Sequence, residues 1–352
     1  MNRKFDNTAW RIAVQPKTNE LLSSFLVRVA HAHGLAPTRF CYYHFPNDSV
    51  WNRDIDQNAN LNFVKRVSTK AALPLERVKA MTLTGLPALT LNRLGIYHRV
   101  RNRHGLRFCP QCLANCAVYL RDWRSVCAVY CPLHRCSLLD ACTACGAMVI
   151  PHRTGKIDHC FSCGSSLALQ PSEQVMITQS QLVEFQQTCI DSFTSNVLES
   201  PSDLQVSYLA AIEILQRLRK ARTDSVISSS DPLPSFLVAS FAEPIPSLSR
   251  TAGAIFHLES TNYLFKKWPE SFRQIARILN LHSRSLGELN PNWSSQIIDE
   301  IQRLPQRSKR EPTSPRSTLR NKLRKIHRQR LPDWRVKRAI LLLKEAKVHH
   351  VY

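Results

Sequence analysis

Eight cysteine and histidine residues between positions 109 and 163 constrain this chain more than any other feature of its sequence. They form four pairs, three of the form C-x-x-C and one of the form C-x-x-H. A two-residue spacer lets one tight turn supply two corners of a tetrahedral zinc site, so four consecutive pairs predict two sites. The predicted ligands are Cys109, Cys112, Cys131, His134, Cys142, Cys145, Cys160 and Cys163.

The intervals between the pairs support this grouping. Eighteen residues separate Cys112 from Cys131, and 14 separate Cys145 from Cys160. Both intervals suit a short hairpin that returns the second pair to the first. Four protein ligands leave no open position for water, so the pattern predicts two structural zinc ions per chain and no catalytic metal.

The residues around the ligands are also typical of metal-binding turns. Pro110 and Pro132 follow the first ligand of two pairs, and proline fixes φ at the start of a turn. Gly146 and Gly164 follow the second ligand of the other two pairs, where a positive φ is common. We therefore expect tight turns at all four pairs.

Five further cysteines are left over. Either Cys116 or Cys127 could replace a neighbouring ligand, and Cys136 lies in the same segment. Burial as small apolar side chains is the favoured role for these three and for Cys41 and Cys189. A disulfide framework is the alternative. The first residues lead into no apolar h-region, so we expect a reducing cytoplasm and metal-held thiolates.

The charge balance points to a polyanionic partner. Lys and Arg number 48 against 26 Asp and Glu, a formal net charge of +22. Nucleic acid is the commonest polyanion in a cytoplasm, so DNA is the predicted partner. A membrane partner is not expected, because no run of about 18 apolar residues and no Lys-rich amphipathic helix with an aromatic face occurs. Solubility alone is the remaining explanation of the charge.

The basic residues are concentrated in two places. No acidic residue occurs from Arg77 to Arg121, and residues 307–338 carry 13 Lys and Arg against 2 acidic residues, a net of +11. Contact with phosphates is the natural use of such stretches. The predicted nucleic-acid contacts are Arg99, Arg101, Arg103, Arg107, Arg316, Arg320, Lys322, Arg324, Lys325, Arg328, Arg330, Arg335, Lys337 and Arg338.

Apolar periodicity predicts a mainly α fold with a small zinc-stabilised β part. Helices are expected over 20–33, from 37 through 43, and over 61–83 with a break at Pro74, which fits a helix-turn-helix-like module. Three helices packed for stability alone would look the same. Further helices are expected over 181–193, over 203–221, from about 270 and after 332.

Four segments follow from this pattern. Residues 1–104 form the N-terminal helix-turn-helix-like module, and residues 105–168 the tandem zinc-binding segment. Residues 169–304 form a helical domain, and residues 305–352 a basic tail with a terminal helix. Trp123 lies between the first two ligand pairs. We interpret its side chain as one that packs on the zinc hairpin rather than one that stacks on a nucleic-acid base.

Several motifs in this order resemble the TniQ family of bacterial transposon proteins, which is related to the TnsD target selectors. The opening segment N-E-L-L-S-S-F-L-V-R-V-A resembles the start of that family, and the zinc pairs follow in the family's order. The segments that carry the resemblance are 19–30, 94–98, 107–112, 119–123, 131–134, 142–146 and 268–272.

The resemblance implies a role in DNA transposition without chemistry of its own. TniQ-like proteins mark a target by binding DNA or by docking on a guide-RNA complex of the Cascade type. They then recruit an AAA+ ATPase of the TnsC or TniB type, which brings in the transposase. Some members act as homodimers, and a location at the bacterial nucleoid is implied. The basic tail from residue 307 departs from the family and favours direct DNA contact.

Two other classes of function, a regulator and a zinc enzyme, also need to be compared with these motifs. A zinc-containing transcriptional regulator without transposition partners would have the same motifs. A zinc deaminase would need H-x-E before P-C-x-x-C, and a zincin would need H-E-x-x-H. Neither pattern occurs, and no paired carboxylates stand out, so an enzyme is not expected.

Overall fold

The computed structural model describes residues 9–86, 91, 105–175, 180–195, 197–199, 205–207, 213–215, 217–218, 234, 251–289 and 293–306. The chain divides into two compact units, Met1–Pro305 and Gln306–Tyr352. All of the predicted contacts in the basic tail, the terminal helix, and Arg99, Arg101 and Arg103 lie outside the described residues. Among the helices that are described, none is long and apolar enough to cross a membrane.

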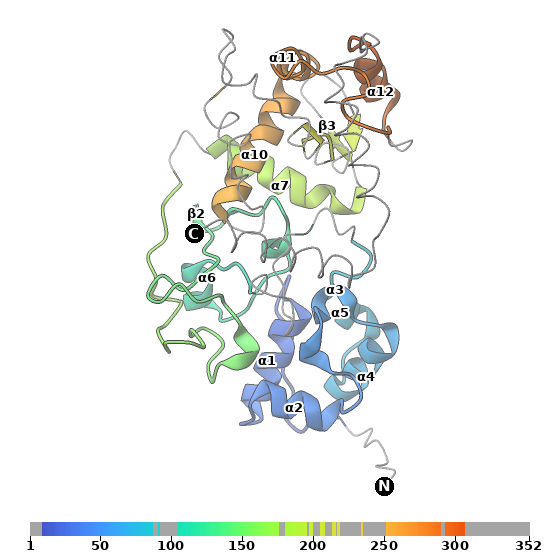
Figure 1. The fold of residues 1–352 in the computed structure, drawn as a ribbon. Coiled ribbons are helices and arrows are strands. Elements are labelled where there is room, and N and C mark those ends of the chain that lie inside the picture. The colour runs from blue at the N-terminus through green and yellow to red at the C-terminus, as the bar shows by residue number, and fades with distance from the viewer. Residues whose placement is uncertain are drawn as a thin grey trace, which may run out of the picture. The chain divides into compact units, whose positions relative to one another are not determined.

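Short helices build the N-terminal part, coloured blue in Figure 1. The predicted helices are present, and a further short helix precedes the third predicted segment. They are α1 (Leu22–Ala32), α2 (Pro37–His44), α3 (Ile55–Asn58), α4 (Leu61–Ala71) and α5 (Leu75–Lys79), with a 3₁₀ turn, η1, at Val50–Asn52.

Local sequence explains where these helices begin and end. Gly34 has a φ of 68° just after α1, and Pro37 occupies the first turn of α2, as the sequence predicts. The side chain of Asn60 caps α4 by accepting a hydrogen bond from the Phe63 amide at 2.8 Å. The break predicted at Pro74 separates α4 from α5.

The segment that carries the metal-ligand pairs has little regular structure. Within the described residues of this segment, two short antiparallel strands form the only ladder longer than one residue pair. This ladder pairs Tyr130 with Ser137 and Cys131 with Cys136. Its elements are α6 (Pro110–Asn115), the 3₁₀ turn η3 (Asp122–Arg124), β1 (Tyr130–Cys131), β2 (Cys136–Ser137) and the 3₁₀ turn η4 (Pro151–Arg153).

Helices return after residue 180, and α7 and α10 pack against each other (Figure 1). The helix predicted over 181–193 is present as α7, and the W-P-E-S-F segment leads into α11 as expected. The elements are α7 (Ser180–Ser195), β3 (Val197–Glu199), β4 (Gln205–Ser207), α10 (Thr251–Lys266), α11 (Glu270–Ile278) and α12 (Ser295–Gln302).

The prediction of a helix from residue 203 is wrong at its start. Residues 205–207 form β4 and pair antiparallel with β3, with Leu198 opposite Val206. The five intervening residues, S-P-S-D-L, are rich in turn formers, and a short apolar run beside them suits a hairpin as well as a helix. Backbone pairing with β3 therefore overrides the helical spacing.

Two clusters of buried side chains hold the described part together. The first joins the N-terminal helices to both metal-ligand groups, through residues such as Phe25, Phe63 and Phe108. The second joins Val129 and Tyr130 to the helices after residue 180. The predicted fold class, mainly α with a small β part, is confirmed. The predicted limits of the four segments stay predictions.

Candidate metal centres

The structure gathers the eight ligands predicted from the sequence into two groups of four. In each group, one ligand atom from every residue lies within 4.8 Å of all the others, so each group could hold a metal ion. Site 1 consists of Cys109, Cys112, Cys131 and His134, and site 2 of Cys142, Cys145, Cys160 and Cys163.

Site 1 is built by a helix N-terminus that faces a hairpin. Cys109 is the N-cap of α6, and its sulfur accepts a hydrogen bond from the Cys112 amide at 3.5 Å. Cys131 ends β1, and its sulfur accepts from the His134 amide at 3.4 Å. Arg135 then takes a φ of 48°, which lets the chain turn back into β2. Backbone amides therefore orient the sulfurs in both turns.

The spacing of the donor atoms in site 1 fits a tetrahedral zinc ion. Zinc–sulfur and zinc–nitrogen bonds of about 2.3 and 2.1 Å imply S···S and S···N separations of about 3.8 and 3.6 Å. The Cys112 and Cys131 sulfurs are 3.6 Å apart. Nδ1 of His134 lies 3.5, 3.2 and 3.6 Å from the sulfurs of Cys109, Cys112 and Cys131. The four donors thus surround a common centre.

The close packing of the thiols in site 1 shifts their pKa values and favours a bound cation. Hydrogen bonds to Cys112 and neighbouring thiols raise the pKa of Cys109 far above its ordinary range. Hydrogen bonds from Cys109 and Cys112 lower the pKa of Cys131 to about 2. The three thiols of site 1 therefore compete for protons through their mutual hydrogen bonds, and a bound cation would favour thiolates at all three.

His134 directs Nδ1 toward the sulfurs and Nε2 toward Asn115. Nε2 lies 3.2 Å from the side-chain amide of Asn115 in α6. A histidine that binds metal through Nδ1 carries its proton on Nε2, so the amide oxygen of Asn115 is the suitable acceptor once that amide is turned. Asn115 can in this way fix the orientation of the imidazole.

A fifth cysteine, Cys136, lies against site 1. Its sulfur is 3.5 Å from the sulfur of Cys109, and its side chain is fully buried in β2. Sequence reasoning named Cys116 and Cys127 as the cysteines able to replace a ligand, whereas Cys136 is the one that the structure places beside Cys109. The available signal was its position two residues after His134, at the far side of a tight hairpin.

Site 2 consists of two similar turns. Gly146 and Gly164 donate backbone hydrogen bonds to Cys142 and Cys160 at 2.8 and 3.0 Å, with φ values of 70° and 73°. The positive φ predicted for both glycines is confirmed. The turns place the Cys142 and Cys163 sulfurs 3.7 Å apart, and those of Cys145 and Cys160 also 3.7 Å apart. These separations again match a tetrahedral zinc ion.

Gln170 supports site 2 from the side. Its amide nitrogen donates to the Cys142 sulfur at 3.1 Å, and its amide oxygen accepts from the Thr143 backbone at 3.0 Å. Cys145 and Cys163 are nevertheless exposed, whereas no ligand of site 1 is. Site 2 is therefore the more accessible of the two groups.

Arg107 is not available for the nucleic-acid contact predicted for it. Its side chain is buried and donates to the carbonyl oxygens of Ser125 and Ala128 at 3.3 and 2.6 Å. Burial lowers the pKa of its guanidinium to about 10, partly opposed by Asp140. Arg107 instead holds the loop that leads into β1, because its five donors suit converging carbonyls.

Gln186 of α7 ties the site 1 hairpin to the later helices. Its oxygen accepts from the amides of Val129 and Tyr130 at 2.8 and 2.9 Å, and its nitrogen donates to the Tyr130 carbonyl at 2.8 Å. The side chain is buried and makes the backbone hydrogen bonds that a neighbouring strand would otherwise make beside β1. Sequence reasoning missed it, although a glutamine between Val183 and Ile190 on a buried helix face was a signal.

The polar residues of the opening motif attach α1 to the segment before β1. The buried carboxylate of Glu20 accepts from Ser24 at 3.0 Å and from Arg28 at 2.6 Å. The Ser24 hydroxyl in turn accepts from the Tyr119 amide at 3.0 Å, and the Leu21 amide donates to the Tyr119 carbonyl at 2.9 Å. Two motifs that are 95 residues apart along the chain are thus in direct contact.

A buried ion cluster makes a second attachment. Arg124 donates to Asp54 at 2.6 Å and to Asp56 at 3.5 Å, and Asp56 also accepts from the amide and hydroxyl of Ser23 in α1.

The cluster also makes stability depend on pH. Burial and the carboxylate of Asp54 raise the pKa of Asp56 to about 6, and Arg124 opposes this increase. The folded state thus binds this proton more tightly than the unfolded chain. The resulting stabilisation is complete below about pH 4 and is lost as pH rises through about 6.

Comparison with known families identifies the part of the chain that contains these attachments. Residues 11–138 match the TniQ family model. The resemblance predicted from the motifs is therefore confirmed over this range, and it associates the range with DNA transposition. A comparison with curated proteins finds no match to the chain.

The TniQ match contains site 1, α1 to α6 and both attachments, and it ends before site 2. Trp123 lies inside the match, is only 3 % exposed and packs edge-on against Tyr119. Its burial agrees with the predicted packing role and leaves no face for a base.

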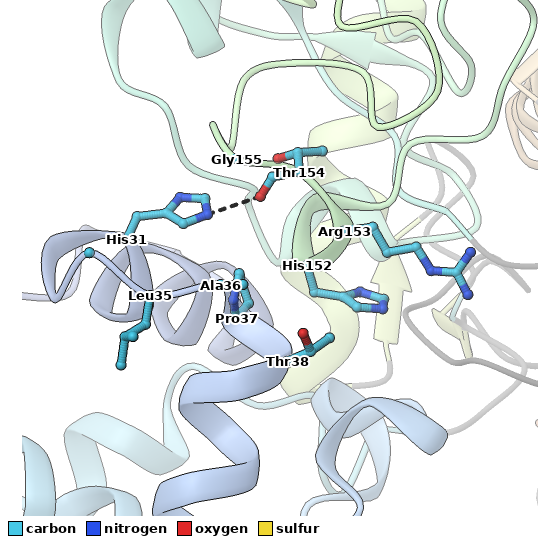
Figure 2. Close-up of a pocket in the computed structure, with 10 residues that line it drawn as sticks. His31, Leu35, Ala36, Pro37, Thr38, His152, Arg153, Thr154 and Gly155 are labelled. Carbon is cyan, nitrogen blue, oxygen red and sulfur yellow. Dashed lines mark hydrogen bonds between the residues drawn. The ribbon is translucent and has the colours of Figure 1, made fainter.

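A hollow of about 610 Å³ also lies within the TniQ match and the residues after it, between the α1–α2 turn and η4. Figure 2 shows Nε2 of His31 directed at the carbonyl oxygen of Thr154, a contact of 3.1 Å. In the same view, the side chains of His152 and Arg153 extend away from His31. Polar groups do not converge on one point there, so the hollow is a weaker ligand site than either metal centre.

Proposed function

We propose that this chain is a target-selection adaptor of DNA transposition. In this role it binds target DNA, or docks on a guide-RNA complex of the Cascade type, and recruits the AAA+ ATPase that brings in the transposase. The match of residues 11–138 to the TniQ family carries the proposal. The mutual contact of its motifs supports it, because the residues behind the resemblance assemble one module on site 1.

Both metal centres are proposed to bind zinc in a structural role. Three thiolates with one imidazole, or four thiolates, are donor sets that zinc favours, and both sets have the spacing that a tetrahedral ion requires. When bound, zinc cross-links the turns that carry its ligands. Two zinc ions per chain are expected by metal analysis of the purified protein, and one or none would contradict the pairing.

The exposed charge of residues 9–86 supports a nucleic-acid partner. Among these residues, the only fully exposed acidic side chain is Glu76, which pairs with Lys79. The carboxylates of Asp54 and Asp56 are buried against Arg124. The surface is therefore positive, which favours phosphate contacts. Its exposed basic residues are Arg11, Lys17, Arg39, Lys65, Arg77 and Lys79.

The adaptor is proposed to have no chemistry of its own. Each metal centre already has four protein donors, which leaves no position for a reacting water. The paired carboxylates of Asp54 and Asp56 are occupied by Arg124 and Ser23. The reaction is instead assigned to the transposase.

Recovery of partners from the native host tests the adaptor role. The tagged full-length chain is purified with and without nuclease treatment, and its partners are identified by mass spectrometry. An AAA+ ATPase that remains after nuclease treatment is the expected result. Recovery of DNA without such an ATPase would favour the alternative, a zinc-containing transcriptional regulator.

A salt titration tests which basic residues contact DNA. We compare the Ala variant of Arg320, Arg324, Lys325 and Arg328 with the Ala variant of Lys17, Lys65, Arg77 and Lys79, which removes the same charge. Each lost phosphate contact should reduce the slope of log K against log salt by about 0.9 on duplex DNA. We expect the tail variant to weaken binding similarly on all sequences. An unchanged affinity and slope would refute a role for the tail.

A further inference from the structure

We propose that Cys136 is a reserve ligand of site 1, whose sulfur takes the place of the His134 imidazole when that side chain leaves the metal. Site 1 would then have five protein ligands for four positions. The inference rests on the proposed zinc occupancy of site 1. It does not depend on the role in transposition.

Hairpin register brings Cys136 to the ligands. Cys136 lies opposite Cys131 in the β1–β2 ladder, and opposite residues of an antiparallel pair project from the same face. Its sulfur is 3.5 Å from that of Cys109, close to the separation of about 3.8 Å expected for two sulfurs on one tetrahedral zinc. Cys136 is therefore already at coordination distance from one ligand.

Cys136 and His134 differ in how firmly they are held. Cys136 is fully buried in β2, forms a bridge to Gln174 on its other side, and hydrogen-bonds the Ser172 hydroxyl. His134 is half-buried, lies in the turn between the strands, and contacts Asn115 at the exposed surface. The histidine is the ligand that can swing outward, whereas the cysteine remains beside the centre.

The exchange balances chemically. While His134 is a ligand, the Cys136 thiol can donate its proton toward the Cys109 sulfur. When His134 leaves, Cys136 gives up that proton, which the freed imidazole accepts, and sulfur replaces nitrogen as the fourth donor. A fourth thiolate adds one negative charge to the site. A chain with a net charge of +22, and with Arg135 exposed in the same turn, tolerates that charge.

The two cysteines named from the sequence as possible replacements face other surroundings. Cys116 is the C-cap of α6, at the far end of the helix from Cys109. Cys127 is buried in the second cluster and hydrogen-bonds Cys189. Among the leftover cysteines that the structure describes, Cys136 is therefore the one whose sulfur lies against a ligand sulfur of site 1.

Zinc content and zinc X-ray absorption of purified full-length variants test the proposal. Wild type should contain two zinc ions that share seven sulfurs and one nitrogen. His134→Ala should keep two zinc ions, now with eight sulfurs. His134→Ala combined with Cys136→Ser should retain only the zinc of site 2. His134→Ala combined with Cys116→Ser is the matched control and should keep both.

Loss of one zinc from His134→Ala would overturn the proposal, as would two zinc ions with seven sulfurs and a light-atom ligand. His134→Cys, which supplies a new thiolate directly, guards against a folding artefact. If His134→Cys folds with two zinc ions and His134→Ala does not fold, Cys136 has failed as a ligand. Wild type without zinc would instead refute the proposed metal role itself.

Discussion

Site 1 and site 2 have similar donor sets but different surroundings. Cys109 and Cys131 of site 1 are at most 1 % exposed, and the site has a helix, a hairpin and α7 around it. Site 2 consists of two turns with Gln170 at their side, and Cys145 and Cys163 are exposed. Both sites therefore touch the same core, through Cys142 and Cys160 in site 2, but site 1 is the more enclosed of the two.

The TniQ match follows the same division. It includes every ligand of site 1 and stops before Cys142, the first ligand of site 2. We expect the centre with no exposed ligand to contribute more to the stability of the matched module than the centre with two exposed ligands. The comparison thus predicts unequal consequences when either metal is removed.

Cys131→Ser combined with Cys136→Ser, which also removes the proposed reserve ligand, should have the largest effect. Zinc binding worth about 10–16 kcal/mol at a structural site is comparable with the whole stability of a domain, about 5–15 kcal/mol. We expect loss of one zinc and of cooperative thermal unfolding by circular dichroism. A variant that unfolds like wild type would show that site 1 is dispensable, contrary to its position in the core.

Cys163→Ser should have a smaller effect, although it also removes a zinc ligand. Cys163 is exposed and, unlike Cys142 and Cys160, does not belong to the buried cluster that contains α1. We expect one zinc to be lost while cooperative unfolding remains, with a midpoint lowered by about 2–8 °C. Unfolding as severe as that of the Cys131→Ser, Cys136→Ser double variant would mean that the two centres form one cooperative unit.

Ligand spacing was sufficient to predict both metal centres, because a C-x-x-C or C-x-x-H turn brings its two ligands together without help from the rest of the chain. The helix ends at Gly34 and Pro37 were predictable for the same local reason. The glycine φ values at Gly146 and Gly164 also follow from local turn geometry.

Long-range partners were not predictable in this way. Arg107 looked like a member of a basic stretch, yet its guanidinium meets carbonyls 18 and 21 residues later in the chain. Gln186 contacts Tyr130 across 56 residues, and β4 pairs with β3 against the local helical pattern. Such contacts depend on tertiary packing, which periodicity and composition do not encode.

Arg124→Met should destabilise the chain strongly, because it leaves two buried carboxylates without their cation. Loss of one partner from a buried ion cluster costs about 3–5 kcal/mol. Arg66→Met is the matched control, since Arg66 pairs with Asp48 but is 34 % exposed, and it should cost at most about 1 kcal/mol. Urea unfolding at pH 7 measures both. Equal costs would show that the cluster does not attach α1 to the site 1 segment.

Gln186→Ala separates two explanations of why site 1 matters. The variant leaves the Val129 and Tyr130 amides and the Tyr130 carbonyl buried without their partner, at about 1–3 kcal/mol for each unsatisfied group that water cannot reach. Gln187→Ala, next to it on the exposed side of α7, is the control and should cost less than about 0.5 kcal/mol.

If site 1 matters only through its ligands, Gln186→Ala will keep both zinc ions and unfold in one transition at a lower urea concentration. If α7 holds the hairpin in place for the metal, the same variant will also release one zinc to a chelator faster than wild type. We expect the second result, because Gln186 bonds the strand that ends in Cys131.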